Sequence, residues 1–150
     1  MAEGYWLATV TPAGRPHAVP IWGVLVDDDL FLETGDMQTV KNRNLAANRQ
    51  VQVHLDGVND VVIVRGRAHP WVPEAALAAR LAVAFSAKYP GYAPTPHAWS
   101  QGGLVLVEPD SVLAWGDIHT ATRWQLRSSH DDDAGSHHGA SRAAPRRRGR

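Results

Sequence analysis

Short runs of apolar and β-branched residues, separated by tight turn signals, occupy most of the chain. The runs are Tyr5–Val10, His17–Val26, Leu30–Thr34, Val51–Leu55, Asp60–Trp71 and Leu104–Gly116, and Thr122–Arg127 follows as the last. Turn-forming segments such as TPAGRP and DDD stand between neighbouring runs. Within one run, Val51, Val53 and Leu55 alternate with polar residues, as in a half-buried strand. This spacing predicts a small barrel or sandwich with few helices.

One longer segment has the pattern of a helix instead. PEAALAARLAVAFSAKY begins with Pro73, a residue suited to the first position of a helix. Leu77, Leu81 and Phe85 then recur at intervals of four residues and share one face. We therefore expect an amphipathic helix that packs on the strands.

The composition is that of a soluble globular protein of one domain, with 15 basic and 15 acidic residues. The absence of cysteine excludes disulfides, thiolate catalysis and cysteine-type zinc sites. The longest apolar stretches are too short to span a bilayer, and the N-terminus has no secretory pattern. We therefore expect a cytoplasmic protein with no membrane contact.

The sequence lacks the common motifs of catalytic and metal-binding side chains. It has no glycine-rich phosphate loop, no nucleophile elbow and no pair of histidines at metal-binding helical spacing. We assign no catalytic side chain and no metal ligand. If the protein is an enzyme, a bound cofactor must supply the chemistry.

The last segment, residues 128–150, differs in composition from the rest. It reads SSHDDDAGSHHGASRAAPRRRGR and contains no large apolar residue. Such a segment buries too little surface to offset its ordering entropy, so we predict a disordered Arg/His-rich tail after a folded domain at residues 1–127. Nucleic-acid binding by its Arg cluster is disfavoured because the folded part offers no basic companion patch.

The polar segment TGDMQTVKNRNLAANRQ is the first candidate for a site. On a helix that starts near its middle, Lys41, Asn44 and Asn48 share one face. Thr34 closes the preceding strand, and Thr39 is placed to cap the first turn. Backbone N–H groups, hydroxyls and a lysine that converge in this way hold phosphate well. A solvated connecting helix explains the same residues, and the segment alone leaves both interpretations open.

A proline inside an apolar run is the second candidate. Pro20, in AVPIWG, donates no hydrogen bond to a sheet, so its strand must be an edge or be broken there. Free peptide groups at such a gap suit the polar rim of a flat ring, with Trp22 packed nearby. A plain edge strand with a bulge is the alternative.

In this order, these residues resemble the pyridoxamine 5′-phosphate oxidase-like split β-barrel superfamily. The resemblance is carried by YWLATVTPAGRPHAVPIWGV, LFLETG, KNRNLAANRQVQVHLDG and the closing TRWQL, and it extends from Tyr5 to Arg127. The last segment looks like the ending of actinobacterial members that use the deazaflavin F420. The resemblance implies a mainly β fold with two helices, a six-stranded antiparallel split barrel. It also implies a homodimer with cofactor sites at the subunit interface, which hold FMN or F420 and, in a few members, a tetrapyrrole.

Residue roles follow from the resemblance position by position. Lys41 would hold the cofactor phosphate with Thr34, Thr39 and Asn44. The ring system would lie against Val19, Pro20, Ile21 and Trp22. Arg123 and Trp124 would border the site from the partner chain.

The resemblance and the missing side-chain motifs together favour an oxidoreductase that transfers hydride between F420, or FMN as second choice, and a small organic substrate. A protein that binds F420, FMN or a tetrapyrrole without turnover is the alternative. Oxidation of vitamin B6 is not expected, because the tail offers no strand to grip the substrate phosphate. Four residues of one long loop, Tyr89, Tyr92, His97 and Trp99, either cover the substrate side or serve structure alone.

Overall fold

A computed structural model describes residues 4–55 and 57–126. The elements are β1 (Tyr5–Val10), β2 (Pro16–Val26), β3 (Asp29–Glu33), α1 (Val40–Ala47), β4 (Gln50–Leu55), β5 (Val61–Pro70), α2 (Ala75–Lys88), β6 (Leu104–Trp115), the short 3₁₀ helix η1 (Ile118–Thr120) and β7 (Thr122–Gln125). The predicted strands are therefore confirmed to within a residue or two at each end. The predicted tail, residues 128–150, lies outside the described residues.

Six strands close into an antiparallel barrel. Their order is β3-β2-β1-β4-β5-β6, and pairing between β3 and β6 joins the two ends of the sheet. This confirms the predicted six-stranded split barrel with two helices. Strand β7 is a seventh strand outside the barrel, and it pairs with β6.

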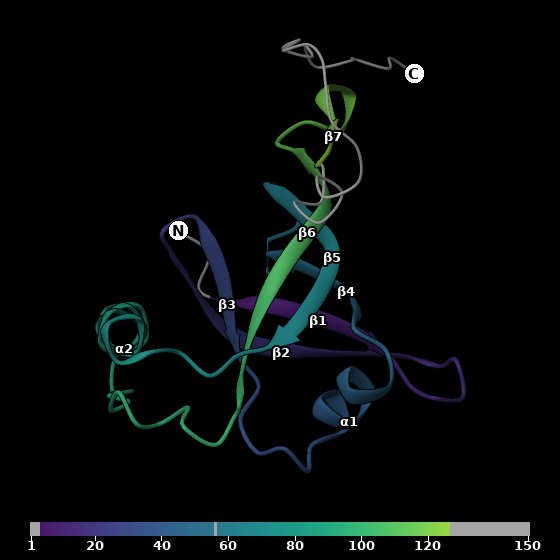
Figure 1. The fold of residues 1–150 in the computed structure, drawn as a ribbon. Coiled ribbons are helices and arrows are strands. Elements are labelled where there is room, and N and C mark those ends of the chain that lie inside the picture. Colours follow the sequence, from purple (N-terminus) through teal and green to yellow (C-terminus); the bar gives the residue numbers. More distant parts are fainter. Residues whose placement is uncertain (1–3, 56, 127–150) are drawn as a thin grey trace, which may run out of the picture.

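Strand β6 pairs with a different strand on one side in each half of its length. Its first part, Leu104–Val107, pairs with β3 and so closes the barrel. Its second part, Ser111–Ala114, pairs with β7 instead, while β5 runs beside both parts. The β6–β7 end therefore projects from the barrel as an arm, which is the upper part of Figure 1.

The inside of the barrel forms the first core. Its buried residues come from all six barrel strands and α1, and they are Leu7, Ile21, Leu32, Leu45, Val51, Val53, Ala68, Val105 and Val107. The paired strands β5 and β6 approach each other closely at a register shift between Arg65 and Gly66. A Cβ on Gly66 would lie 2.0 Å from the carbonyl oxygen of Glu108, so only glycine fits there.

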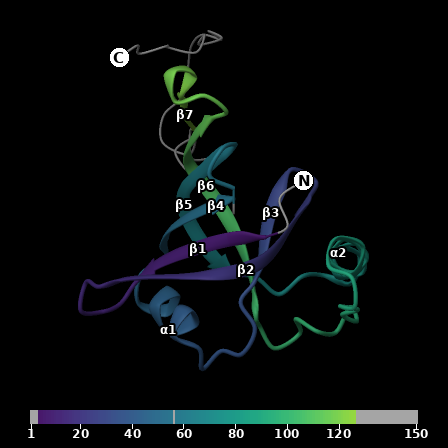
Figure 2. The ribbon, with the colours of Figure 1, turned by 180° about the vertical axis from the view of Figure 1, so that it is seen from behind.

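A second core joins α2 to the outside of the barrel. Figures 1 and 2 show α2 beside the β2–β3 hairpin, and α1 near the opposite end of β2. Leu81 and Phe85 of α2 are fully buried against Val24 and Phe31, which confirms the predicted apolar face of the helix. None of the helices in the described residues has the length and apolar character needed to cross a membrane.

Two tight turns set the strand registers. In the β1–β2 turn, Gly14 has a φ of +77° and its N–H donates to the carbonyl of Thr11. In the β2–β3 turn, Asp27 and Asp28 have φ values of +54° and +68°. Positive φ at two central residues matches the right-handed twist of a hairpin, and aspartate tolerates it better than most residues. Both turns lie where the sequence predicts them.

Candidate functional site

The connection between β3 and α1 is held in a fixed shape by backbone and amide hydrogen bonds. The N–H groups of Thr34 and Gly35 both donate to the carbonyl oxygen of Gly103, at 2.8 and 3.3 Å. The side-chain amide of Asn42 donates to the carbonyl oxygens of Thr34, Gly35 and Asp36, at 3.3, 3.3 and 2.8 Å. This connection therefore presents the residue after β3 and the first turn of α1 in one arrangement.

Buried side chains anchor the inward face of helix α1 to the barrel. Leu45 enters the barrel core, and the amide of Asn44 donates to the hydroxyl of Thr9 at 3.0 Å. Asn42 and Asn44 are both buried. With these residues turned inward, Lys41 is left at the edge of the helix, half-buried beside the end of β3.

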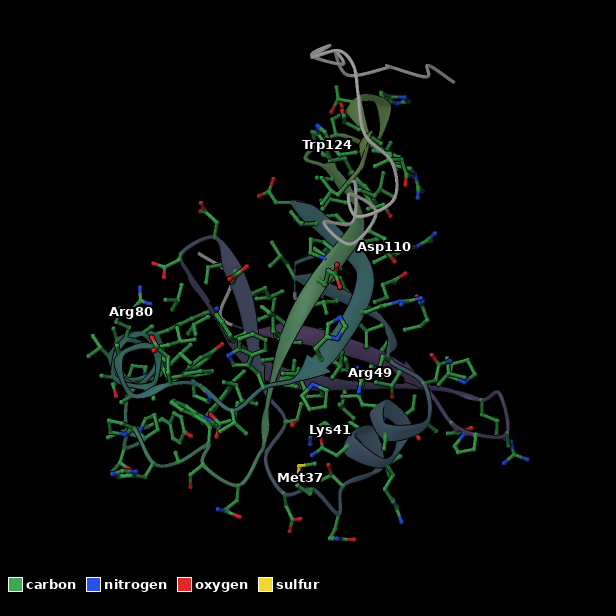
Figure 3. All side chains as sticks on the ribbon, viewed as in Figure 1. Met37, Lys41, Arg49, Arg80, Asp110 and Trp124 are labelled. Atoms are coloured by element: carbon green, nitrogen blue, oxygen red, sulfur yellow. The ribbon has the colours of Figure 1, made fainter. Side chains whose placement is uncertain are left out.

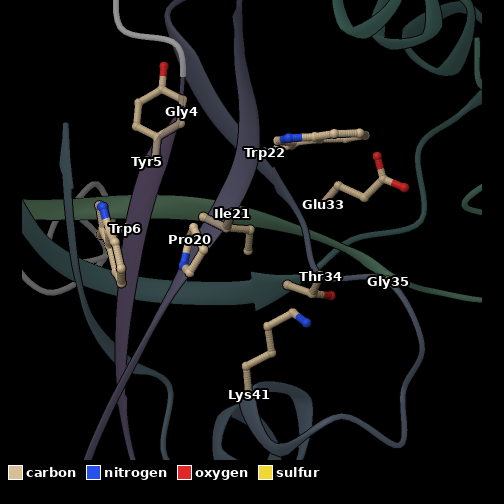
Figure 4. A pocket seen from close by; sticks show the side chains of 10 residues that line it. All are labelled: Gly4, Tyr5, Trp6, Pro20, Ile21, Trp22, Glu33, Thr34, Gly35 and Lys41. Carbon is tan, nitrogen blue, oxygen red and sulfur yellow. The ribbon is translucent and has the colours of Figure 1, made fainter. Parts of the chain in front are cut away.

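A cleft of about 570 Å³ opens where β1, β2, the end of β3 and α1 meet. Its ten lining residues are Gly4, Tyr5, Trp6, Pro20, Ile21, Trp22, Glu33, Thr34, Gly35 and Lys41. Figure 4 shows the ammonium of Lys41 and the hydroxyl of Thr34 directed into the same space. The cleft is therefore charged at its α1 end and aromatic at its β2 end.

Two polar atoms of the cleft residues lack partners. Thr34 Oγ1 and Glu33 Oε2 are buried and make no hydrogen bond within the described part of the chain. The Thr39 hydroxyl is in the same condition nearby. Buried polar atoms without partners are uncommon and costly, and a ligand or an ordered water in the cleft would supply the missing bonds.

The open edge at Pro20 is present as predicted. Pro20 lies opposite Trp6 of β1, whereas pairing between β2 and β3 starts only at Trp22. Residues 16–21 of β2 therefore have β1 as a neighbour on one side and no strand of the described chain on the other. Because β2 continues through Pro20 without a break, the edge alone accommodates the proline.

An aromatic wall stands at the β2 end of the cleft. The Trp22 ring stacks on Tyr89, with centroids 4.8 Å apart and planes 17° from parallel, and it also contacts Tyr92 at 4.9 Å. The Tyr89 hydroxyl accepts from the N–H of Gly23 at 2.9 Å, and the Tyr92 hydroxyl donates to Glu33. Trp22 remains 46% exposed, so one part of its ring is free for a ligand.

Burial raises the pKa values of three groups at this wall. Desolvation raises the pKa of Glu33, and the hydrogen bond from Tyr92 partly offsets this rise. Desolvation and the bond to Glu33 raise the pKa of Tyr92 well above its usual range. Tyr5 also has a raised pKa, first because of burial and then because of its proximity to Tyr89. Both tyrosines are therefore neutral at physiological pH.

The structure brings half of the predicted site residues together. Pro20, Ile21, Trp22, Thr34 and Lys41 line the one cleft. Val19 lies half-buried on β2, one residue beyond the cleft lining. The Thr39 residue occupies the position before α1, but its hydroxyl makes no capping hydrogen bond, which corrects the predicted cap. Asn44 bonds to Thr9 and so supports α1 from beneath the helix.

The two remaining predicted residues lie elsewhere. Arg123 and Trp124 are exposed on β7, in the projecting arm. Figure 3 labels Trp124 and Lys41 at opposite ends of the molecule. Within one chain, the arm therefore does not border the cleft.

The sequence analysis missed five lining residues, namely Gly4, Tyr5, Trp6, Glu33 and Gly35. A signal for two of them was available. The TPAGRP turn fixes the β1–β2 register, which places Trp6 opposite Pro20 and Tyr5 opposite Ile21. For Glu33 the signal is weaker, because a half-buried carboxylate at a strand end resembles a solvated one in sequence.

Three of the four residues of the long aromatic loop pack on the second core or on Trp22, which agrees with the structural role, whereas the substrate-covering role stays a prediction. Trp99 is buried in the second core, where it contacts Phe85, so its role is structural. Tyr89 and Tyr92 support Trp22 from the side of α2. His97 is exposed.

The molecule is a six-stranded barrel, and the open edge of β2 borders a cleft that contains the ammonium of Lys41. These features define a class of proteins, the split β-barrel proteins. The sequence profile of the pyridoxamine 5′-phosphate oxidase family matches residues 4–116, which is most of the chain. The chain therefore belongs to this family. No curated protein matches the sequence.

Three solved structures share the fold at low sequence identity. General Stress Protein 26 from Bacillus anthracis str. Sterne superposes with a TM-score of 0.65 at 20% identity, over 84% of this chain and 91% of that one. An F420 reductase superposes with a TM-score of 0.57 at 24% identity, over 73% and 87%. A pyridoxamine 5′-phosphate oxidase-related, FMN-binding protein from Nostoc punctiforme gives 0.52 at 18%, over 81% and 78%. These likenesses establish the fold.

Proposed function

We propose that the cleft binds a phosphorylated flavin-type cofactor, F420 first and FMN second, and that the protein is an oxidoreductase. The observation that carries this proposal is the pair formed by Lys41 and the unpartnered Thr34 hydroxyl, which line one cleft with the open edge at Pro20. One end of the cleft thus suits an anion and the other suits a flat ring.

The residues at the α1 end fit a phosphate. A phosphate oxygen would accept from the Thr34 hydroxyl and from the ammonium of Lys41, which would satisfy an atom that now lacks a partner. The N-terminus of α1 adds the positive end of a helix dipole, and its first turn contains no acidic residue to compete for it. The Thr39 hydroxyl, buried and free at that N-terminus, is a third donor.

The residues at the β2 end fit a flat ring. Pro20 and Ile21 offer an apolar strip along the unpaired edge of β2, and the free peptide groups of that edge would be available to the rim of a bound ring. Trp22 provides a stacking surface that Tyr89 and Tyr92 keep in place. A bound flavin or deazaflavin ring supplies hydride transfer, and the chain's own residues position it and limit access of water.

F420 is placed ahead of FMN because of the Thr122-Arg123-Trp124 ending, which looks like that of F420-dependent actinobacterial members. One of the solved structures with this fold is named an F420 reductase. Both observations support the proposal through likeness, whereas the cleft itself suits either cofactor.

We also place the protein in a homodimer with the cofactor at the interface. Trp124 and Leu126 of the arm are 41% and 43% exposed, and among the described residues β7 pairs with no strand other than β6. Exposed apolar side chains on a projecting arm favour contact with a second copy. In such a dimer, Arg123 and Trp124 would border the partner's cleft.

The rival function is binding without turnover, as in a carrier protein. None of the ten cleft residues of the described chain is histidine, cysteine or methionine, and Tyr5, the one lining residue of a type that ligates haem iron, has a raised pKa that disfavours the ligating tyrosinate. This composition favours a flavin-type ring over a tetrapyrrole. A carrier would bind the cofactor equally well but would not accelerate its reoxidation by any substrate.

Titration of the purified protein with F420 and with FMN tests the proposal. Lys41→Ala should weaken binding of the preferred cofactor at least tenfold. Arg43→Ala is the matched control, because Arg43 is exposed on the same helix and does not line the cleft. Absence of binding by the wild-type protein, or equal losses in the two variants, would refute the phosphate site.

A further inference from the structure

Glu33 lies at the point where the aromatic wall meets the cleft. It is the last residue of β3 and pairs with Trp22 across the β2–β3 ladder. Directly opposed residues of an antiparallel pair extend their side chains from the same face of the sheet. Both side chains line the cleft, and Figure 4 shows the Glu33 side chain next to the Trp22 ring.

The carboxyl group of Glu33 is only half satisfied. Its Oε1 accepts a hydrogen bond from the Tyr92 hydroxyl at 2.5 Å. Its Oε2 is buried and has no partner, and neither of the two ion pairs within the described residues includes Glu33. A buried carboxylate oxygen without a donor is destabilising, so its retention in a cleft points to a donor that arrives with a ligand.

The carboxyl group is also held in position. Tyr92, which donates to it, contacts the ring of Trp22 and the edge of Phe85, with centroids 4.9 and 6.2 Å away. Phe85 is fully buried in the second core. Because this chain of contacts leads from the core to Glu33, the free oxygen is preorganised before any ligand binds.

Two lysines, Lys41 and Lys88, lie on the helices around Glu33. Lys41 lines the cleft from α1, where it suits the phosphate, and Lys88 of α2 donates to the carbonyl oxygen of Gly23. Burial raises the pKa of Glu33, whereas the hydrogen bond from Tyr92 favours the ionised form. An ionised Oε2 accepts hydrogen bonds and donates none.

We infer that Glu33 determines the specificity of the cleft, because its Oε2 accepts a hydrogen bond from an N–H donor on the rim of the bound ring. The inference rests on the proposed function. Flavins and deazaflavins share a uracil-like rim in which the imide N3–H is the donor between two carbonyl groups. The inference therefore holds for either cofactor, and it predicts that rings without this donor are rejected.

The test compares binding of riboflavin and 3-methylriboflavin, measured by fluorescence titration. Neither compound carries a phosphate, so Lys41 does not contribute to the comparison. The wild-type protein should bind riboflavin at least tenfold more tightly, the effect of one hydrogen bond to a charged group. In Glu33→Met, which keeps the chain length but removes both oxygens, the ratio of the two dissociation constants should fall to about one.

Each ratio is measured within one protein, so partial destabilisation of a variant cancels. Should Glu33→Met fail to fold, Glu33→Gln has the same shape and a weaker, neutral acceptor, and its ratio should fall at least threefold. Arg43→Ala serves as the control and should keep the wild-type ratio, because Arg43 is exposed on α1 and does not line the cleft.

The outcomes separate the two proposals. A wild-type ratio near one, or an unchanged ratio in both Glu33 variants, would overturn the role of Glu33 while the phosphate site stands. If the wild-type protein binds no flavin and no deazaflavin at all, the proposed function is overturned and this inference with it.

Discussion

The ring of Trp22 stacks on the ring of Tyr89, with centroids 4.8 Å apart and planes 17° from parallel. Trp22 belongs to the barrel strand β2, and Tyr89 is the C-cap residue directly after α2. The contact therefore attaches the second core to the wall of the candidate cleft. Changes at Tyr89 should affect both stability and the site.

Tyr89→Phe should lower the free energy of unfolding by about 1–3 kcal/mol. The substitution leaves the stacked ring in place but removes the hydroxyl that accepts from the buried N–H of Gly23. Urea denaturation measures the change. Tyr5→Phe is the control, since no hydrogen bond of the Tyr5 hydroxyl is found among the described residues, and it should change stability by less than about 0.5 kcal/mol. Equal effects of the two substitutions would contradict the bridging role of Tyr89.

Gly66→Ala should be far more damaging, with a loss of at least about 3 kcal/mol. A Cβ there would lie 2.0 Å from the carbonyl oxygen of Glu108 and 2.8 Å from the Cα of Pro109, so the backbone of β6 must move. Thermal unfolding followed by circular dichroism measures the loss. Gly57→Ala is the matched control, because its Cβ meets the nearest atom at 3.5 Å. A loss of stability in Gly66→Ala no larger than that in Gly57→Ala would show that β5 and β6 are less closely packed at this position than the distances indicate.

The pH dependence of stability should carry a signature of Glu33. Because burial raises its pKa in the folded state, the folded protein binds the proton more tightly than the unfolded chain. The contribution of Glu33 to stability is therefore fully present below the unfolded pKa of 4.5 and is lost as pH rises through the raised folded value. Glu33→Gln lacks this titration. The wild-type free energy of unfolding, minus that of the variant, should fall as pH rises above 4.5, and a rise would contradict the direction of the shift.

The arm should be part of a dimer interface. Light scattering on the purified protein should give about twice the chain mass of 16.3 kDa. Trp124→Ala should weaken both the dimer and cofactor binding, because the arm would border the partner's cleft. Val83→Ala, on the exposed side of α2, should change neither. A monomeric wild-type protein that binds the cofactor at full affinity would exclude this arrangement.

Much of the fold was predictable because its signals are local. Alternating apolar residues, the TPAGRP and DDD turns and the face of Leu81 and Phe85 fix the strands, the hairpins and α2. Barrel closure depends on pairing between β3 and β6, which are far apart in sequence, and only the resemblance to a known family supplied it.

The site was predictable in part for the same reason. Lys41 and Thr34 were predicted because they lie around a helix start, and Pro20 was predicted because it cannot donate a hydrogen bond within a sheet; all three line the cleft. Glu33 was missed because its hydrogen-bond partner is Tyr92, a residue 59 positions away. Asn44 was assigned to the ligand although it bonds to Thr9, because periodicity places a residue on a helix face without showing what that face contacts.

The central claim is that Lys41 binds the phosphate of the cofactor, and a binding cycle tests it most directly. FMN is compared with riboflavin, and F420 with its phosphate-free deazaflavin core, in the wild-type protein and in Lys41→Ala. We predict that Lys41→Ala weakens the phosphorylated member of the preferred pair at least tenfold and leaves its partner within about twofold. Equal losses for both members, or no loss for either, would contradict the account.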